Sequence, residues 1–298
     1  MRVLVTGGAG FVGSTIVDGL AARGDQVVAI DDLSTGDRRN LAPGIVLHVA
    51  SVADRAQLET ALAGEAFDAI VHCAAKTKVV ESMEKVDLYR RVIVDGTRNV
   101  AALAEQVGAR VLVNISTGGA MYGETPVCAT EESPAVPDSN YGRFKREAEG
   151  IVANARVPSI SLRLGNVYGP RQRQDLEGGV IAIFIGTWRR KQPVTIFGPG
   201  TAARDYVDVA DVAAAVMSAL AGRWIGTYNI GTGVATTVNT LVAELTALLG
   251  PPVEVRRAPP RAVEIERACV DPGKAAREGL WTPRTDLRAG LARTIAAG

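Results

Sequence analysis

The sequence predicts an α/β protein whose core is a doubly wound parallel sheet with helices packed on both faces. Two features of the chain indicate this fold. Short runs rich in β-branched residues alternate with segments of helical periodicity. These runs are apolar throughout, which is typical of strands buried on both sides. The expected strands are residues 3–5, 27–30, 45–49, 69–71, 111–115 and 160–164, and the expected helices are about 12–23, 54–64, 85–107 and 139–155.

The pattern changes after Gly165 and predicts a smaller second unit. A Gly/Pro-rich stretch precedes a helix near 179–190 and a strand at 194–197. A helix near 208–221 and a strand at 227–230 are expected to return to the first sheet. We therefore divide the chain into a main domain, residues 1–164 plus about 206–235, and a smaller C-terminal α/β lobe over the carboxyl edge of the sheet, residues 165–205 and 236–298.

Length, charge and hydropathy limit the classes of function. A chain of 298 residues can bury a large core, which suits an enzyme. Lys and Arg number 33 against 32 Asp and Glu, and this balance gives no electrostatic reason to expect nucleic acid as a partner. The chain has no signal-peptide pattern and no run of roughly 18 apolar residues. We therefore expect a soluble, cytoplasmic protein with neither a membrane nor a nucleic acid as partner.

The three cysteines are Cys73, Cys128 and Cys269. They lie far apart in sequence and form no C-x-x-C pair, which argues against a disulfide framework and against a zinc site. We expect no bound metal. We interpret the cysteines as free thiols in a reducing compartment.

The first predicted strand is followed by glycines whose spacing favours a dinucleotide. Gly7, Gly10 and Gly13 form a G-x-x-G-x-x-G pattern directly before the first predicted helix. Glycine permits a tight turn and lets a pyrophosphate approach the backbone, while the N–H groups at the start of the helix point at the anion. The pattern predicts a Rossmann-type dinucleotide site. The alternative is a glycine-rich turn without a ligand.

Asp31, at the end of the second predicted strand, indicates which dinucleotide is bound. A carboxylate at this position can accept hydrogen bonds from the adenosine ribose hydroxyls, and it disfavours a 2′-phosphate. We therefore predict NAD rather than NADP, although Arg38 and Arg39 follow closely.

A phenol and an ammonium group lie four residues apart, at Tyr141 and Lys145. This spacing places both on one face of the predicted helix 139–155. A nearby cation stabilises a phenolate, so Lys145 could lower the pKa of Tyr141 enough for proton exchange with a substrate hydroxyl. Alone the Y-x-x-x-K pattern is weak, but it gains weight from the dinucleotide motif that precedes it.

Several further motifs accompany the glycines and the Tyr-Lys pair along nearly the whole chain. They are Asp31-Asp-Leu-Ser-Thr-Gly36, His72-Cys-Ala-Ala75, Ser116-Thr-Gly-Gly-Ala-Met-Tyr-Gly123, Arg163-Leu-Gly-Asn-Val-Tyr-Gly-Pro-Arg171, Arg204-Asp-Tyr206 and Tyr228-Asn-Ile-Gly231. Taken together, these motifs resemble the extended short-chain dehydrogenase/reductases of the NAD-dependent epimerase/dehydratase family, and within that family the nucleotide-sugar epimerases.

The resemblance implies a set of residues around NAD. Lys145 would reach the nicotinamide ribose, while Ser51 and Val52 would flank the adenine. Two positions depart from the family pattern, since Ser51 replaces a common Asp and Ile93 stands where Asn is frequent. The residues implied for NAD are Gly7, Gly10, Phe11, Val12, Gly13, Asp31, Asp32, Leu33, Ser34, Thr35, Gly36, Ser51, Val52, Ala74, Ala75, Lys76, Tyr141 and Lys145.

The resemblance also implies a hydroxyl at the end of the fifth strand, which completes a catalytic triad with Tyr141 and Lys145. Thr117 is our candidate, and Ser116 is the alternative. The position where the family often carries this hydroxyl is Gly118 here, so the register stays open. The structural alternative for Thr117 is a hydroxyl that only caps the turn.

For the substrate, the resemblance implies contacts to the diphosphate of a nucleotide sugar. Asn166 would meet the phosphates, while Arg204 and Arg261 would supply planar donors. Arg204 lies in a segment that matches the family closely, whereas Arg261 lies in one that keeps only part of the usual pattern because Val263 replaces a glycine.

The sugar itself is less well determined. The stretch around Arg171 and Arg173 is similar to that of glucuronate 4-epimerases, and either side chain could pair with a C6 carboxylate. The following segment, which ends at Val180, instead resembles the glucose/galactose type. Hexose, N-acetylhexosamine and uronic acid all stay open, with UDP-glucose/UDP-galactose favoured over UDP-glucuronic acid, and UDP favoured over dTDP by resemblance only.

The expected reaction is a redox-neutral 4-epimerisation through a transient 4-keto sugar, in which Tyr141 exchanges the proton and NAD the hydride. The alternatives are a 4,6-dehydratase, a decarboxylase or reductase, and a non-catalytic NAD-binding protein. Related dehydratases carry Asp-Glu after the triad Thr, whereas Gly118-Gly119 follow Thr117 here. The family usually dimerises through the helices expected at 85–107 and 139–155, so we expect a homodimer.

Overall fold

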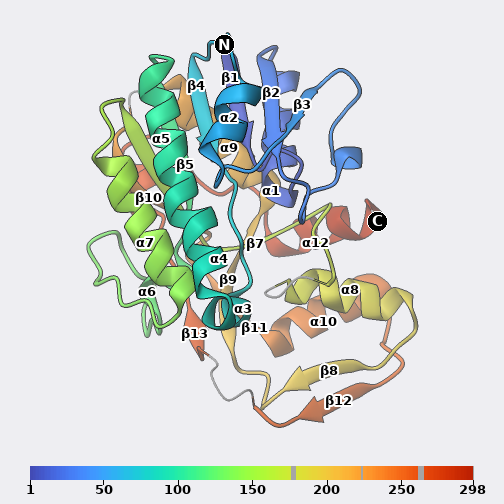
Figure 1. Ribbon diagram of the computed structural model, residues 1–298. Helices are drawn as coiled ribbons and strands as arrows, with labels where there is room; N and C mark the ends of the chain where they lie inside the picture. The colour runs from blue at the N-terminus through green and yellow to red at the C-terminus, as the bar shows by residue number, and fades with distance from the viewer. Residues whose placement is uncertain (176–178, 223, 261–264, 298) are drawn as a thin grey trace.

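A computed structural model describes residues 1–175, 179–222, 224–260 and 265–297 (Figure 1). Its main element is a parallel sheet of seven strands in the order β10-β6-β5-β4-β1-β2-β3. The predicted strands are confirmed within a few residues. Their bounds are β1 Arg2–Thr6, β2 Gln26–Asp31, β3 Val46–Val49, β4 Ala69–His72, β5 Val111–Thr117, β6 Ser159–Leu164 and β10 Gly226–Ile230.

The two faces of the sheet bury alternate residues of the same strands. On β1, Val3 and Val5 pack against α1 (Phe11–Ala22) and α9 (Val209–Ala221). Leu4 points to the opposite face, where the core includes residues of α2 (Arg55–Ala61), α5 (Gly96–Gln106) and α7 (Asn140–Ala153). This two-sided burial explains why the strands read as unbroken apolar runs. The doubly wound, Rossmann-type fold is therefore confirmed.

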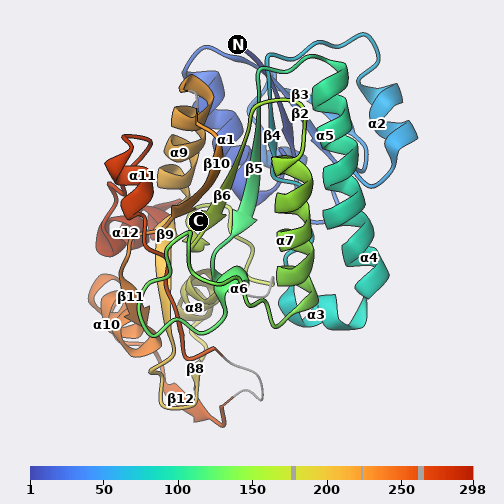
Figure 2. The same ribbon diagram turned by 90° about the vertical axis from the view of Figure 1, so that its left-hand side faces the viewer.

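The helix expected at 85–107 is a continuous helical segment of three parts. It consists of α4 (Val86–Arg90), a single π-helical turn, η2 (Arg91–Asp95), and α5. Ile93, which departs from the family pattern, lies on this turn and is 1% exposed, packed in an apolar cluster with Tyr89 and Phe144. Figure 2 shows α4, α5 and α7 together on one side of the sheet.

The smaller lobe lies at the carboxyl ends of the main strands (Figure 1). It contains two short sheets and three helices around its own apolar cluster. No helix in the described ranges is long and apolar enough to cross a membrane. The elements are β7 Asn166–Tyr168, β9 Ala203–Asp208, β11 Ala235–Thr237 and β13 Arg267–Ala268 in one sheet, β8 Val194–Phe197 and β12 Val255–Ala258 in the other, and α8 Val180–Arg189, α10 Val238–Leu249 and α12 Leu287–Ala296.

Part of the C-terminal tail packs on the main sheet rather than in the lobe. The helix α11 (Gly273–Arg277) lies beside β10, and Leu280 and Trp281 belong to the core of the main domain. The indole of Trp281 donates to the carbonyl of Asp211 at 2.9 Å. The predicted division places residues 236–298 in the lobe and so does not include this packing of the tail on the main sheet.

The prediction that all three cysteines are free is wrong for Cys128 and Cys269, which form a disulfide. Their Cα atoms lie 4.5 Å apart because Ala129 pairs with Val270 in a β-bridge. A sequence separation of 141 residues gives no spacing signal, so only the fold brings the two thiols together. Cys73 is free. The cysteines therefore give no indication of a reducing compartment.

We expect this disulfide to stabilise the fold by about 2–4 kcal/mol, because it closes a long loop in the unfolded chain. A reductant should therefore lower the melting temperature by about 5–10 °C for a chain of this size. Differential scanning fluorimetry with and without reductant measures the effect. The variant Cys128→Ser/Cys269→Ser should melt at the reduced temperature in both conditions, and a sensitivity to reductant that persists there would contradict the assignment.

Candidate functional site

A cavity of about 1020 Å³ lies where the main sheet meets the smaller lobe. Residues that follow the carboxyl ends of β1, β2, β4, β5 and β6 line it, together with residues from α7 and the lobe. Parallel strands bring their carboxyl ends to one edge of a sheet, and open α/β sheets bind their ligands there. The candidate site therefore lies where the fold class predicts it.

The glycine turn between β1 and α1 is built without room for side chains. Gly7 has a φ of +65°, and a Cβ there would lie 2.8 Å from the backbone of Ala74. A Cβ on Gly13 would lie 2.1 Å from the carbonyl oxygen of Gly7. Gly10 precedes α1, and no side chain caps the helix. The turn thus presents backbone and a helix N-terminus to the cavity, as an anion site requires.

Asp31 connects the glycine turn to the loop that follows β2. Its carboxylate accepts hydrogen bonds from the backbone N–H of Ala9 at 3.0 Å and of Leu33 at 2.8 Å. The side chain lines the cavity while only 7% of the residue is exposed, and this burial raises the pKa of its carboxyl group. Two carboxylate oxygens have further lone pairs, so Asp31 can still accept from a ribose hydroxyl.

The loop after Asp31 is held from both sides of the cavity. Lys76 donates to the hydroxyl of Ser34 at 2.8 Å, and the guanidinium of Arg173 donates to the carbonyl of Thr35 at 3.2 Å. Ser34 also donates to Asp32 at 2.6 Å. These contacts within the chain order the loop beside the cavity.

Most residues implied for the cofactor line the cavity, but three do not, judged over the described chain. Leu33 contributes its N–H to Asp31, and a Cβ on Gly36 would lie 2.7 Å from the same carboxylate. Ser51 turns its hydroxyl to the N–H of Ala53 at 3.3 Å. These three shape the loops behind the lining residues. Val52 does line the cavity.

Thr117, Tyr141 and Lys145 all line the cavity. The phenol of Tyr141 shares a hydrogen bond with the hydroxyl of Thr117. Ser116 points the other way and donates to the carboxylate of Glu149 at 2.6 Å. Of the two candidate hydroxyls, Thr117 interacts with the Tyr141 phenol whereas Ser116 contacts Glu149, and Thr117 also accepts from the N–H of Ala120 at 3.3 Å.

Burial sets the protonation of the Tyr-Lys pair. It raises the pKa of Tyr141 to about 12, although the hydrogen bond to Thr117 acts in the opposite direction. It lowers the pKa of Lys145 to about 8, because the ammonium is 5% exposed. Lys145 donates to the carbonyl of Ile115 at 2.8 Å. In the protein alone, burial thus keeps the phenol protonated, contrary to the lowered pKa that the sequence led us to expect from Lys145.

A buried histidine, His72, lies behind the glycine turn, and the sequence pattern assigned it no role. His72 hydrogen-bonds to Thr6 at 2.7 Å and to Thr97 at 3.0 Å. Burial lowers its pKa to about 3, so the ring is neutral near pH 7. Thr6 also accepts from the N–H of Ala74 at 3.3 Å. This arrangement fixes the ends of β1 and β4 beside the cavity.

On the side of the lobe, Asn166 and Arg204 line the cavity as expected. They lie on the neighbouring strands β7 and β9. Ala268 joins them because β13 pairs with β9, opposite Arg204. Val180, at the start of α8, does not line the cavity in the described structure. Arg261 lies outside the described residues.

Arg171 and Arg173 also line the cavity, but each guanidinium is paired within the chain. Arg171 forms an ion pair with Asp18 at 2.7 Å. Arg173 pairs with Asp175 at 2.6 Å, in addition to its contact with Thr35. The carboxylate of a sugar would have to compete with these partners.

Sequence reasoning missed one wall of the cavity. Val79, Val80 and Met83 line it from the short helix α3 (Val79–Glu84), although all three are exposed. Ile265 lines it from the lobe. A helix of six residues gives too few repeats for a periodic signal, and residues near β13 reach the site only through its pairing with β9.

Comparisons with known proteins agree with this geometry. Residues 3–231 match the model of the NAD dependent epimerase/dehydratase family. A UDP-glucose 4-epimerase from Mycolicibacterium smegmatis is 36% identical over 99% of this chain and 97% of its own length.

Two solved structures share the whole fold. A UDP-glucose 4-epimerase from Thermotoga maritima with UDP-glucose is 34% identical with a TM-score of 0.95, over 100% of this chain and 98% of that one. A UDP-glucose 4-epimerase from Thermus thermophilus in complex with NAD is 38% identical with a TM-score of 0.94, over the same shares. This chain therefore belongs to the NAD dependent epimerase/dehydratase family.

Proposed function

We propose that this chain is an NAD-dependent UDP-sugar 4-epimerase that acts through a transient 4-keto sugar. One observation carries the proposal: a single cavity brings together the glycine turn, the Thr117–Tyr141–Lys145 cluster, and Asn166 with Arg204. These parts supply a dinucleotide site, a proton-transfer group and diphosphate contacts. The identities of the family members compared above support the same reaction.

The cavity suits NAD in its shape and its donors. The crowded glycine turn leaves its backbone open to a pyrophosphate, and Asp31 offers a carboxylate to a ribose. The buried Oε1 of Gln172, a residue that lines the cavity, has no hydrogen-bond partner in the described structure. When bound, NAD supplies the acceptor and donor of the hydride.

The chain itself moves the proton. Tyr141 takes the proton of the sugar 4-hydroxyl when the ketone forms and returns it when the ketone is reduced. Thr117 holds the phenol through their hydrogen bond and can extend a second one to the substrate. An ammonium near a phenol favours the phenolate, and Lys145, which follows Tyr141 by four residues on α7, is the group proposed for this role. The net reaction leaves the cofactor unchanged.

Dehydration is the nearest alternative chemistry, because it begins with the same oxidation. It needs a further acid and base beside the triad, and Gly118 and Gly119 occupy those positions. Glycine supplies neither group, and Gly118 has no room for a side chain because a Cβ there would lie 2.3 Å from the side chain of Val270. This favours epimerisation over dehydration.

A neutral hexose fits the site better than a uronic acid. Arg171 and Arg173 are the side chains expected to bind a C6 carboxylate, and both are paired with Asp18 and Asp175 of the chain itself. Replacing those partners would cost part of the gain from a new ion pair. We therefore place UDP-glucose and UDP-galactose ahead of UDP-glucuronic acid.

The test is to incubate the purified protein with UDP-glucose and, separately, UDP-glucuronic acid, with and without added NAD. Products are resolved by NMR and mass spectrometry. We expect UDP-galactose at unchanged mass. Loss of water would support a dehydratase and loss of carbon dioxide a decarboxylase. Tight NAD binding with no turnover of any nucleotide sugar tested would support the non-catalytic alternative.

Thr117 and Ser116 are separated by a pair of variants. Thr117→Ala should lower kcat by about 100-fold, because the Tyr141 phenol loses its partner. Ser116→Ala should keep kcat within about tenfold, because Ser116 contacts Glu149 rather than Tyr141. Steady-state kinetics with UDP-glucose measures both. A larger loss in Ser116→Ala would reassign the catalytic hydroxyl.

We also propose a homodimer that associates through α4, α5 and α7. These helices lie together on one side of the sheet (Figure 2). Analytical ultracentrifugation tests the oligomeric state, and a single monomeric species at micromolar concentration would contradict the dimer.

A further inference from the structure

A buried ion pair lies directly behind the Tyr-Lys pair. Glu149 follows Lys145 on α7 by four residues, as Lys145 follows Tyr141, so the three side chains share one face of the helix. Glu149 is 8% exposed. Arg163, on β6, binds its carboxylate through two guanidinium nitrogens at 2.7 and 3.0 Å. Both side chains of the pair are about one-tenth exposed.

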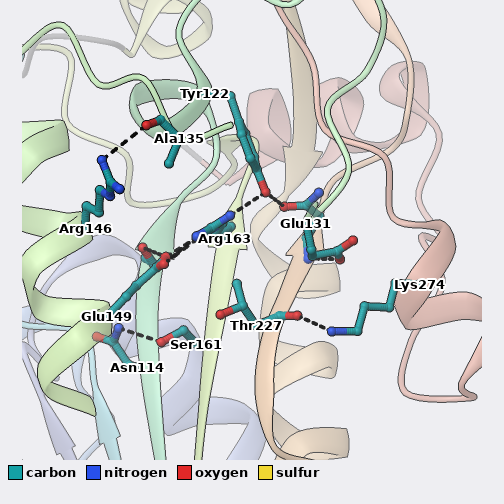
Figure 3. Close-up of polar contacts among 12 residues, drawn as sticks. Asn114, Tyr122, Glu131, Ala135, Arg146, Glu149, Ser161, Arg163, Thr227 and Lys274 are labelled. Atoms are coloured by element: carbon teal, nitrogen blue, oxygen red, sulfur yellow. Dashed lines mark hydrogen bonds and ion pairs between the residues drawn. The ribbon is translucent and has the colours of Figure 1, made fainter. Parts of the chain in front are cut away.

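The pair contacts the catalytic strand and reaches far beyond it. Ser116, next to Thr117, donates to Glu149 at 2.6 Å. On the other side, Arg163 donates to the phenol oxygen of Tyr122 at 2.7 Å, and Tyr122 donates to Asn229 at 2.8 Å. Figure 3 shows Arg163 between Glu149 and Tyr122. The pair thus joins α7 to the end of β5 and to the segment after it.

We propose that the Glu149–Arg163 pair is a positioning element of the active site, which fixes the Ser116–Thr117 strand end against α7 and sets the electrostatic potential at Lys145 and Tyr141. Two charges buried together cost desolvation and are weak evidence for a purely stabilising role. Their place, one helical turn beyond Lys145, indicates a role in the site instead. The inference rests on the proposed function of Tyr141 and Lys145.

The other titratable groups that face Lys145 are uncharged near pH 7, so the charge beside Lys145 is changed by substitutions in the Glu149–Arg163 pair. From the end of β4, His72 is held neutral by burial, and burial raises the pKa of the Cys73 thiol to about 12, so it is protonated near pH 7. From α7, Tyr141 is protonated in the protein alone. Glu149 raises the pKa of Lys145 against the dominant effect of burial. Arg163 compensates part of the Glu149 charge.

Two variants of the pair should therefore act in opposite directions. Glu149→Gln leaves the guanidinium of Arg163 unpaired, so the pKa values of Lys145 and Tyr141 should fall. Arg163→Gln leaves the carboxylate unpaired, so both should rise. We expect shifts of roughly 0.5–1 pH unit. Because a change in nearby charge moves both pKa values in the same direction, the sign holds whichever group limits the pH profile.

Two readouts measure the shift. The first is the pH dependence of kcat with UDP-glucose. The second is the titration of Lys145 in protein labelled with ¹³C in its six lysines, assigned with Lys145→Met and recorded without sugar. The second readout does not need turnover, so it tests this inference even if the proposed reaction is wrong.

The matched control is Glu147→Gln, which removes a carboxylate from the same helix. Glu147 pairs with Arg90 at 2.9 Å on the exposed side of α7, so its loss should leave both titrations unchanged. The double variant Glu149→Gln/Arg163→Gln should return close to the parent. A purely structural pair would give no shift, or the same shift in both single variants, and either result would overturn the proposal. If one single variant does not fold, the other single variant and the double variant decide together, because an electrostatic role requires a shift of the expected sign that the double variant reverses.

Discussion

Replacing Tyr141 with Phe should lower kcat for UDP-sugar epimerisation by about 1000-fold while NAD stays bound. A general acid–base group typically contributes 10²- to 10⁴-fold, and Phe keeps the ring but has no proton to exchange. The glycine turn and Asp31, which also line the cavity, are untouched by this change. Steady-state kinetics and the NAD content of the purified variant measure the two effects.

Tyr206→Phe is the control for this variant. The hydroxyl of Tyr206 is buried and has no hydrogen-bond partner among the described residues, so its removal should change neither kcat nor NAD content. The catalytic assignment fails if Tyr141→Phe retains more than about a tenth of parental kcat. Loss of NAD from Tyr141→Phe would instead indicate that the phenol serves binding.

The sequence was most informative where one physical rule acts locally. Strands buried on both faces read as apolar runs, so the main sheet was predicted within a few residues of each strand. The spacing of Gly7, Gly10 and Gly13 predicted the dinucleotide turn because a side chain at each of these positions would be too close to backbone atoms. Tyr141 and Lys145 could be paired because helical spacing alone places them together.

What the sequence could not provide depends on contacts between distant segments. The disulfide of Cys128 with Cys269 forms only because a β-bridge aligns the two segments. The choice between Ser116 and Thr117 depends on which hydroxyl reaches Tyr141 rather than Glu149 on α7, and this follows only from how β5 packs against that helix. Ala268 reaches the cavity only because β13 adds to β9.

The pKa of Tyr141 is a fourth case that depends on contacts between distant segments. Helical spacing predicts an interaction with Lys145, but it gives no measure of how deeply the phenol is buried. Burial is a property of the whole fold, and here it raises the pKa to about 12. A positive charge that enters the cavity with a ligand would favour the phenolate, so we expect the site to gain its basic form on binding.

Replacing Gly13 with Ala should weaken NAD binding by at least about 100-fold. A Cβ at this position would lie 2.1 Å from the carbonyl oxygen of Gly7, and both atoms belong to backbone that cannot move away cheaply. The turn must therefore shift, which displaces the N–H groups that bind the pyrophosphate. A loss of two or three such hydrogen bonds corresponds to about 3 kcal/mol or a 100-fold change in affinity.

Gly19→Ala is the matched control on the same helix, α1. There a Cβ would meet only the end of the flexible Met217 side chain, at 3.3 Å, so NAD affinity should be unchanged. Titration of NAD into each variant by calorimetry compares the affinities, and the melting temperature without NAD shows whether the fold survives. Parental affinity in a folded Gly13→Ala variant would mean that the glycine turn does not carry the cofactor, and the site would have to be sought elsewhere in the cavity.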